Sequence, residues 1–172
     1  MIRSWGLQAF TGTAQPLFGD LLTAPLSKLK QPNGFYFVSV ANAARYQIGD
    51  RIVIGFGGTI PNNCLMVNAV NTTTNVLSCR SEGDAPVVNW PTGTQIVLSL
   101  ACAVLTVQVQ TGTAWLGVDD TVTNAGAGSA FAEILAGGSF KFGDAGWNTI
   151  RTTEAWIAGT QGDTYGVAAI II

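Results

Sequence analysis

The spacing of apolar and turn-forming residues constrains the fold of this chain more than any other feature of its sequence. Short runs in which apolar and polar residues alternate recur along the chain, as at residues 35–40, 51–55, 64–70 and 94–100. A period of two places successive side chains on opposite faces of a β-strand. Turn signals separate these runs at intervals of about eight to twelve residues, whereas stripes at helical spacing are nearly absent. The sequence therefore predicts an all-β protein built from small barrels or sandwiches.

The runs divide the chain into three segments. Residues 1–30 hold apolar side chains with little alternation, and we interpret them as an extended N-terminal arm, although an ordinary edge strand fits the same pattern. Residues 31–102 are expected to form a first antiparallel β module, and residues 103–172 a second module that is an immunoglobulin-like or jelly-roll-like sandwich. The uncharged run at residues 167–172 would aggregate if exposed, so we expect it at the centre of a sheet or beneath a neighbour.

The chain has three cysteines, Cys64, Cys79 and Cys102. If residues 71–75 form a hairpin loop, Val67 lies opposite Cys79, Ala69 lies opposite Leu77, and Cys64 points to the other face. Cys64 and Cys79 then cannot form a disulfide. We interpret all three as buried thiols in a reducing compartment, and the absence of Cys-x-x-Cys spacing gives no sign of zinc. The sequence predicts neither a metal nor a cofactor.

Catalytic side chains are scarce. The chain contains no histidine, which excludes Ser–His and Cys–His nucleophilic pairs. Asp119 and Asp120 are adjacent, and neighbours in a strand point to opposite faces, so we interpret them as turn residues rather than cation ligands. Glu82, Glu133 and Glu154 are too widely dispersed to identify a glycosidase pair. The sequence predicts that the protein is not an enzyme.

Charge and hydropathy limit the partners. The eight Lys and Arg residues are scattered, whereas nucleic-acid binding needs a clustered basic surface. The longest apolar stretch, residues 96–107, is interrupted and shorter than the roughly 20 residues that span a bilayer. No secretion signal is visible at the N-terminus, so we expect the protein to stay in the cytoplasm where it is made. With 48% hydrophobic and 10% charged residues, apolar surface should remain after folding, as in a member of an assembly.

Several short motifs resemble segments of virion proteins of tailed bacteriophages. In the first half they are TGTAQPLFGD at residues 11–20, YQIGDRIVIG at residues 46–55 and VNAVNTTTNVL at residues 67–77. In the second half they are AWLG at residues 114–117, LAGGSF at residues 135–140 and AWIAGTQGDT at residues 155–164. The order of the second set is similar to that of a virion β-sandwich.

The resemblance implies a structural role in the phage particle, and we expect a decoration (cement) protein on the surface of a capsid assembled in the host cytoplasm. The implied partners are the major capsid protein or other virion proteins, together with copies of the chain itself, a trimer being favoured. Strand addition and apolar anchoring by the arm are the expected mode of binding. The predicted partner-binding residues are Phe10, Pro16, Leu17, Phe18, Leu21, Leu22, Ile170, Ile171 and Ile172.

Two other functions remain open. A receptor- or carbohydrate-binding module of a neck, tail or fibre requires exposed Trp and Tyr side chains in the second half of the chain. An enzyme acting on glycans requires two carboxylates that converge in a cleft. The sequence does not decide where in a particle the protein lies.

Overall fold

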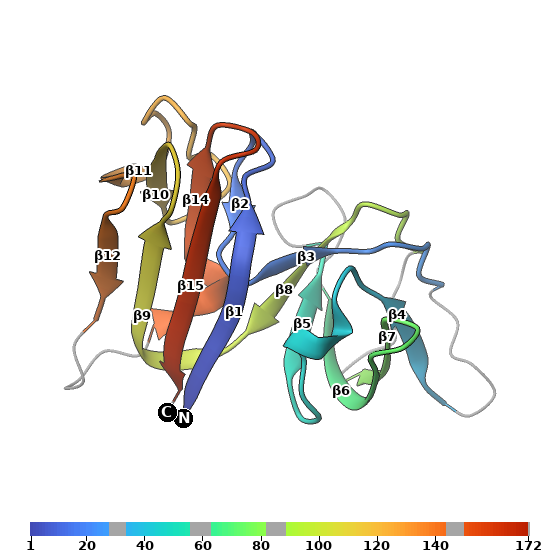
Figure 1. Cartoon of the computed structure of the whole chain (residues 1–172). Helices are drawn as coiled ribbons and strands as arrows, with labels where there is room; N and C mark the ends of the chain where they lie inside the picture. Colours follow the sequence, from blue (N-terminus) through green and yellow to red (C-terminus); the bar gives the residue numbers. More distant parts are fainter. Residues whose placement is uncertain (28–33, 56–62, 82–88, 144–149, 172) are drawn as a thin grey trace. The chain divides into compact units, whose positions relative to one another are not determined.

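A computed structural model describes residues 1–27, 34–55, 63–81, 89–143 and 150–171 (Figure 1). Regular structure in these residues is antiparallel β-sheet apart from two short 3-10 turns, so the all-β prediction is confirmed. The chain divides into two compact units, of which unit 1 comprises residues 1–18 and 100–172, and unit 2 comprises residues 19–99. Within the described ranges, no helix is long and apolar enough to cross a membrane.

Unit 1 contains two antiparallel sheets, the first of which we call sheet A. Its strand order is β1-β15-β9-β12, and β13 also pairs with β9. The bounds are Ile2–Ala9 for β1, Ala101–Val109 for β9, Ser139–Phe142 for β12, Ile150–Arg151 for β13 and Thr164–Ile171 for β15. Because β15 lies between β1 and β9, the prediction that the uncharged C-terminal run occupies the interior of a sheet is confirmed.

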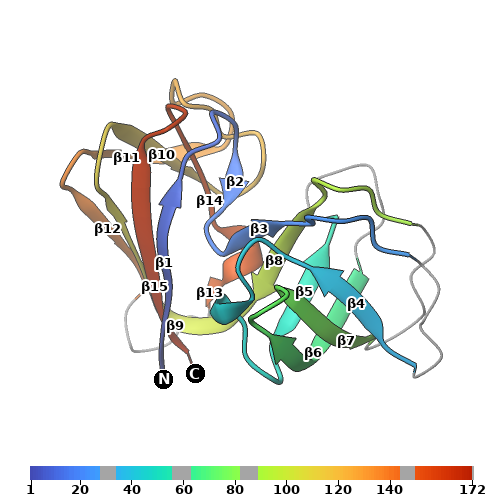
Figure 2. The same cartoon turned by 45° about the vertical axis from the view of Figure 1, so that its right-hand side comes forward.

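The second sheet of unit 1, sheet B, has the order β11-β10-β14-β2. The bounds are Gln15–Pro16 for β2, Thr113–Gly117 for β10, Ala130–Leu135 for β11 and Trp156–Gly159 for β14, which follows a 3-10 turn, η2, at Thr152–Glu154. The two sheets form the two layers of a sandwich (Figures 1 and 2). Phe10 joins the layers, because its ring lies 4.7 Å from that of Tyr165 in sheet A and against Gly159 in sheet B.

The loop between β10 and β11, residues 118–129, covers part of the outer face of sheet B. Val122 is buried and packs against Gly117, and Gly126 lies directly against the ring of Trp115. A side chain at Gly126 would have its Cβ only 2.8 Å from that ring, so this close approach requires glycine. Trp156 and Ala158, which point outward from β14 beside Gly117 and Trp115, are also buried.

Unit 2 is a six-stranded sheet with the order β3-β8-β5-β6-β7-β4. The terminal strands of this order meet just beyond their ends, where Leu22 bridges Val40 and the Thr23 N–H donates to the Ser39 carbonyl oxygen at 3.0 Å. The sheet therefore closes into a small barrel (Figure 2). The bounds are Gly19–Leu21 for β3, Tyr36–Ser39 for β4, Arg51–Ile54 for β5, Asn63–Asn71 for β6, Val76–Ser81 for β7 and Gln95–Ser99 for β8, with a 3-10 turn, η1, at Ala43–Arg45.

The hairpin of β6 and β7 differs in one detail from its prediction. Val67 lies opposite Cys79 as expected, but Ala69 pairs with Ser78 rather than with Leu77. A β-bulge between Val67 and Ala69 inserts one residue and shifts the register beyond it. Ala69 is exposed, whereas Val67 is buried. All three cysteines are free thiols, as expected, but only Cys79 and Cys102 are buried, whereas Cys64 is half-buried.

The two units do not follow the predicted division into residues 1–30, 31–102 and 103–172. Residues 1–18 belong to unit 1, where β1 pairs along β15 and β2 pairs with β14, while β3 belongs to the barrel. A bulge between Ser4 and Gly6, whose φ is +74°, reverses the alternation after Trp5, so that Trp5 is buried whereas Leu7 points outward. This bulge interrupts the alternation of β1, which is why the segment has the pattern of an arm although it forms a strand.

Candidate interaction surface

The acidic residues singled out in the sequence serve the fold. In the described part of the chain, no group of three or more Cys, Asp and Glu residues could hold a metal ion. Asp119 lies in the loop at residues 118–129, where its Oδ1 accepts hydrogen bonds from the Thr121 N–H at 2.9 Å and the Thr121 hydroxyl at 2.6 Å. These bonds lower the pKa of Asp119. The predicted turn role of Asp119 is confirmed.

Asp20 is a buried carboxylate at the seam of the barrel. Its Oδ1 accepts from the Leu21 N–H at 2.8 Å and from the Ala41 N–H at 3.3 Å, and its Oδ2 accepts from the Tyr46 hydroxyl at 3.4 Å. Burial raises the pKa of Asp20, and it also raises the pKa of Tyr46, which the adjacent carboxylate raises further. Asp20 thus fastens β3 to the chain that follows β4.

Most of the predicted partner-binding residues lie in the cores of their own units. Leu21 and Ile170 are exposed by 42% and 45%, and Ile171 is half-buried. Ile172 lies outside the described residues. Anchoring of a partner by the buried side chains of the predicted arm would require β1, β2 and β3 to leave their sheets. The buried members of the set are Phe10, Pro16, Leu17, Phe18 and Leu22.

Side chains suited to stacking on sugars are enclosed. Trp115 is half-buried beneath Gly126, and Trp147 lies outside the described residues. Over the ranges that the structure describes, no Trp or Tyr is exposed. The buried members are Trp5, Trp90, Trp156, Tyr36, Tyr46 and Tyr165.

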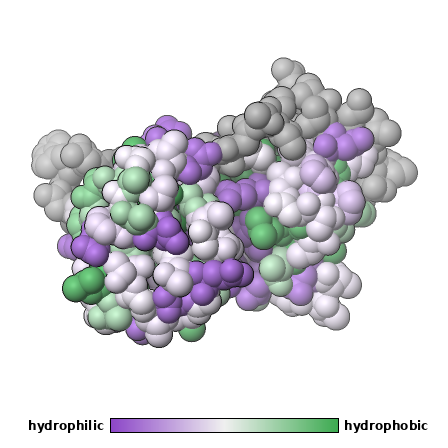
Figure 3. All heavy atoms as spheres, turned by 90° about the horizontal axis from the view of Figure 1, so that it is seen from above, coloured by the Kyte–Doolittle hydropathy of each residue, from purple (hydrophilic) through white to green (hydrophobic). Residues whose placement is uncertain are grey.

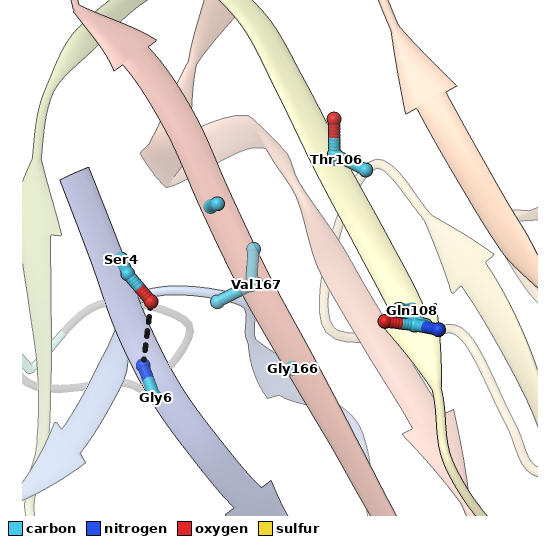
Figure 4. Close-up of a pocket in the computed structure, with 7 residues that line it drawn as sticks. Ser4, Gly6, Thr106, Gln108, Gly166 and Val167 are labelled. Atoms are coloured by element: carbon cyan, nitrogen blue, oxygen red, sulfur yellow. Dashed lines mark hydrogen bonds between the residues drawn. The ribbon is translucent and has the colours of Figure 1, made fainter. Parts of the chain in front are cut away.

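The outer side of sheet A carries exposed side chains, and we call this surface the sheet A face. The register pairs Ile2 with Ile170 and Leu7 with Gly166, and the partners of each pair point outward. The side chains of Ile2, Leu7 and Ile170 are exposed by 75%, 61% and 45%. Between them is a hollow of about 230 Å³ (Figure 4). The small or uncharged residues that line it include Ser4, Gly6, Thr106, Gln108, Gly166 and Ala168.

Side chains of β1 form hydrogen bonds with backbone groups of the same strand. The Ser4 hydroxyl accepts from the Gly6 N–H at 3.4 Å, as Figure 4 shows, and the Gln8 amide donates to the Trp5 carbonyl oxygen at 3.0 Å. The bulge between Ser4 and Gly6 further disrupts the row of backbone groups. Bulges and occupied backbone groups are features that oppose the addition of another strand.

A second exposed apolar feature, the phenylalanine cluster, lies where β11 and β12 approach at one side of the sandwich. Its members are Phe131, Phe140 and Phe142. Their ring centroids are 5.0 to 6.0 Å apart in edge-to-face arrangements, and Phe131 is 48% exposed. Phe131 is the extra residue of a bulge between β10 and β11, which explains why it is not directed as strand alternation predicts.

The sequence reasoning did not identify the exposed residues of either surface, except Ile170. Alternation in SFKF at residues 139–142 was a usable signal for Phe140 and Phe142, whereas the bulges hide the orientation of Leu7 and Phe131. On the face in Figure 3, hydrophilic side chains form separate patches among residues of intermediate hydropathy.

Comparisons with known proteins give little further information. No protein-family model and no curated protein matches the sequence. Among solved structures, VP17, a capsid protein of bacteriophage P23-77, is similar with a TM-score of 0.24 and 11% sequence identity, over 99% of this chain and 88% of that chain. A TM-score this low does not establish a shared fold.

Proposed function

We propose that the protein is a structural component of a bacteriophage particle that binds the capsid shell as a decoration protein. The observation that carries the proposal is the phenylalanine cluster, an exposed aromatic surface on a chain with few charges. Aromatic side chains are enriched and charged ones depleted at the cores of protein interfaces. The short motifs that resemble tailed-phage virion proteins support the choice of partner, a shell protein.

Burial of the cluster provides a usable amount of binding energy. A Phe side chain has an accessible area of roughly 200 Å², and Phe131 is 48% exposed. A partner that covers it removes about 100 Å² from water, which corresponds to about 2.5 kcal/mol at about 25 cal/mol per Å². The neighbouring rings already hold Phe131 in place, so little side-chain entropy is lost on binding. Loss of this contact should weaken binding at least tenfold.

The test uses particles of the phage that encodes the chain, prepared with its gene deleted. Purified full-length protein is added back, and the bound fraction is measured by co-sedimentation over a range of concentrations. We expect saturable binding and greater resistance of the particles to heat, because a ligand that binds only the assembled state stabilises it. An absence of binding by the unaltered protein would refute the proposed function.

Two variants locate the contact. Phe131→Asp places a charge in the cluster and should reduce binding at least tenfold. Ile48→Asp introduces the same charge at another exposed apolar position, 73% exposed in unit 2, and should bind as the unaltered protein does. Circular dichroism and thermal unfolding establish that both variants are folded. Equal binding by the two variants would show that the cluster is not the contact surface.

A further inference from the structure

We propose that the sheet A face is a self-association surface, which packs against the same face of a second copy of this chain around a twofold axis. The contact goes beyond the proposed shell contact and does not depend on it, because the face and the phenylalanine cluster use different residues. The predicted trimer does not follow from this face, since a surface that meets itself generates twofold symmetry.

The shape of the face suits an apolar counterpart. Ile2 and Ile170 form a raised pair at one end, Leu7 rises nearer the other, and Gly166 and Ala168 lie between them. The hollow of about 230 Å³ exceeds the roughly 150 Å³ of an engineered apolar cavity that accepts benzene. It is large enough for an aliphatic side chain. In a symmetric pair, the raised residues of each copy can enter the hollow of the other.

The charge distribution selects a second copy as the occupant. When a surface packs against its own copy across a twofold axis, a charged residue near the axis lies close to the same residue of the other copy, and the two charges repel each other. The outward residues of the central strands β15 and β9 beside the hollow are Gly166, Ala168, Thr106 and Gln108, none of them charged. The charges lie at the margins, where Lys141 occupies the outermost strand and the Met1 ammonium group donates to the Ile171 carbonyl oxygen.

Other routes to pairing within unit 1 are less favourable. Ser4 and Gln8 occupy backbone groups of β1, which opposes edge-to-edge addition of a second copy. The outer face of sheet B is partly covered by the loop at residues 118–129, which packs on Gly117 and Trp115. Among the sheet surfaces of this unit that the structure describes, the sheet A face is therefore the one whose uncharged central residues remain accessible.

The dimensions predict a weak contact. Sheet A has four main strands, and at about 4.8 Å between strands and about 3.3 Å per residue its face covers on the order of 500 Å² in projection. Side-chain relief increases the accessible area, but the face stays at the low end of stable interfaces, which bury about 800 Å² per partner. The dimer should form in a concentration-dependent manner and be reinforced where copies are held close together.

Analytical ultracentrifugation of the full chain over a wide concentration range tests the proposal. A Cβ at Gly166 meets no atom within 4 Å, so this position tolerates substitution. Gly166→Glu places a charge at the floor of the hollow and should weaken dimerisation at least tenfold. Gln161→Glu adds the same charge to an exposed turn of the same unit and should dimerise as the unaltered chain does.

Three results would overturn the proposal: a chain that stays monomeric at all concentrations, a trimer, or a Gly166→Glu variant that associates as tightly as the unaltered chain. Binding to gene-deleted particles is measured in parallel. A monomeric chain that still binds particles refutes the twofold contact and leaves the shell contact in place. A dimer that does not bind particles supports the twofold contact and refutes the shell contact.

Discussion

Substitution of Gly159 by Ala tests the placement of the N-terminal segment in the core of unit 1. A Cβ at Gly159 would lie 2.8 to 2.9 Å from three ring atoms of Phe10. Ordinary carbon contacts are about 3.5 to 4.0 Å, so the ring has to move by roughly 1 Å. Phe10 is only 2% exposed and packs on Tyr165 at 4.7 Å, which leaves the ring little room.

The expected cost follows from two opposing terms. Overpacking of a filled core typically costs about 1 to 3 kcal/mol, whereas replacing a strand glycine by alanine gains about 0.5 to 1 kcal/mol. Gly159→Ala should therefore destabilise unit 1 by up to about 2.5 kcal/mol. Phe10→Leu should also destabilise, but the smaller side chain makes space for the new methyl group. The double variant should be more stable than the sum of the two changes predicts.

Native-state hydrogen exchange measured by mass spectrometry provides the assay, with the peptide covering residues 164–171 as the reporter of unit 1. Gly166→Ala is the matched control, because its Cβ enters open space on the outer side of the same unit, and it should not destabilise. If residues 1–18 were a free arm, Gly159→Ala would stabilise unit 1 by about 0.5 to 1 kcal/mol and the two changes would be additive. Additivity within about 0.3 kcal/mol would refute the observed packing.

Three further predictions concern a carboxylate, a loop and two thiols. Burial raises the pKa of Asp20, so the folded barrel binds this proton more tightly than the unfolded chain. We compare the free energy of unfolding of unit 2 in urea between the unaltered protein and Asp20→Asn. The unaltered protein should gain stability relative to the variant as the pH falls through the raised pKa toward the usual Asp range. A difference between the two proteins that stays constant with pH would contradict this. Gly128→Ala places a methyl group against the Thr121 carbonyl oxygen, and the φ of Gly128 is +72°. Limited proteolysis should therefore cut residues 118–129 faster in this variant than in the unaltered protein. Unchanged cleavage would count against the packing of the loop. Burial raises the pKa of Cys79 to about 12, so alkylation of the native protein followed by mass spectrometry should label the half-buried Cys64 first, and equal rates would be inconsistent with the structure.

The fold class was accessible from the sequence because strand alternation is a local signal. The same reasoning correctly placed the C-terminal run in the interior of a sheet, since an uncharged β-forming strand needs neighbours on both sides. It also placed Val67 opposite Cys79. Register beyond a bulge was not accessible, because nothing in the local pattern around Ala69 marks the inserted residue.

The interaction surfaces were less predictable, for a related reason. Phe10 and Leu17 were assigned to an arm because their apolar side chains lack a repeating pattern. In the structure they fill the interior of a sandwich whose other strands come from the opposite end of the sequence. Which apolar residues remain exposed depends on these long-range pairings. Leu7 and Phe131 each lie at or beside a bulge, and the identity of the neighbouring residues does not reveal which face they occupy.

The pairing of β1 with β15 has a consequence for synthesis on the ribosome. All strands of the barrel lie between residues 19 and 99, so this unit can close while the ribosome is still making the rest of the chain. Sheet A cannot close until β15 has emerged, because β1 pairs with β15. Until then the apolar side chains of β1 are not packed against β15. Unit 1 should thus be the slower to fold, and β1 should depend on chaperones until β15 has been made.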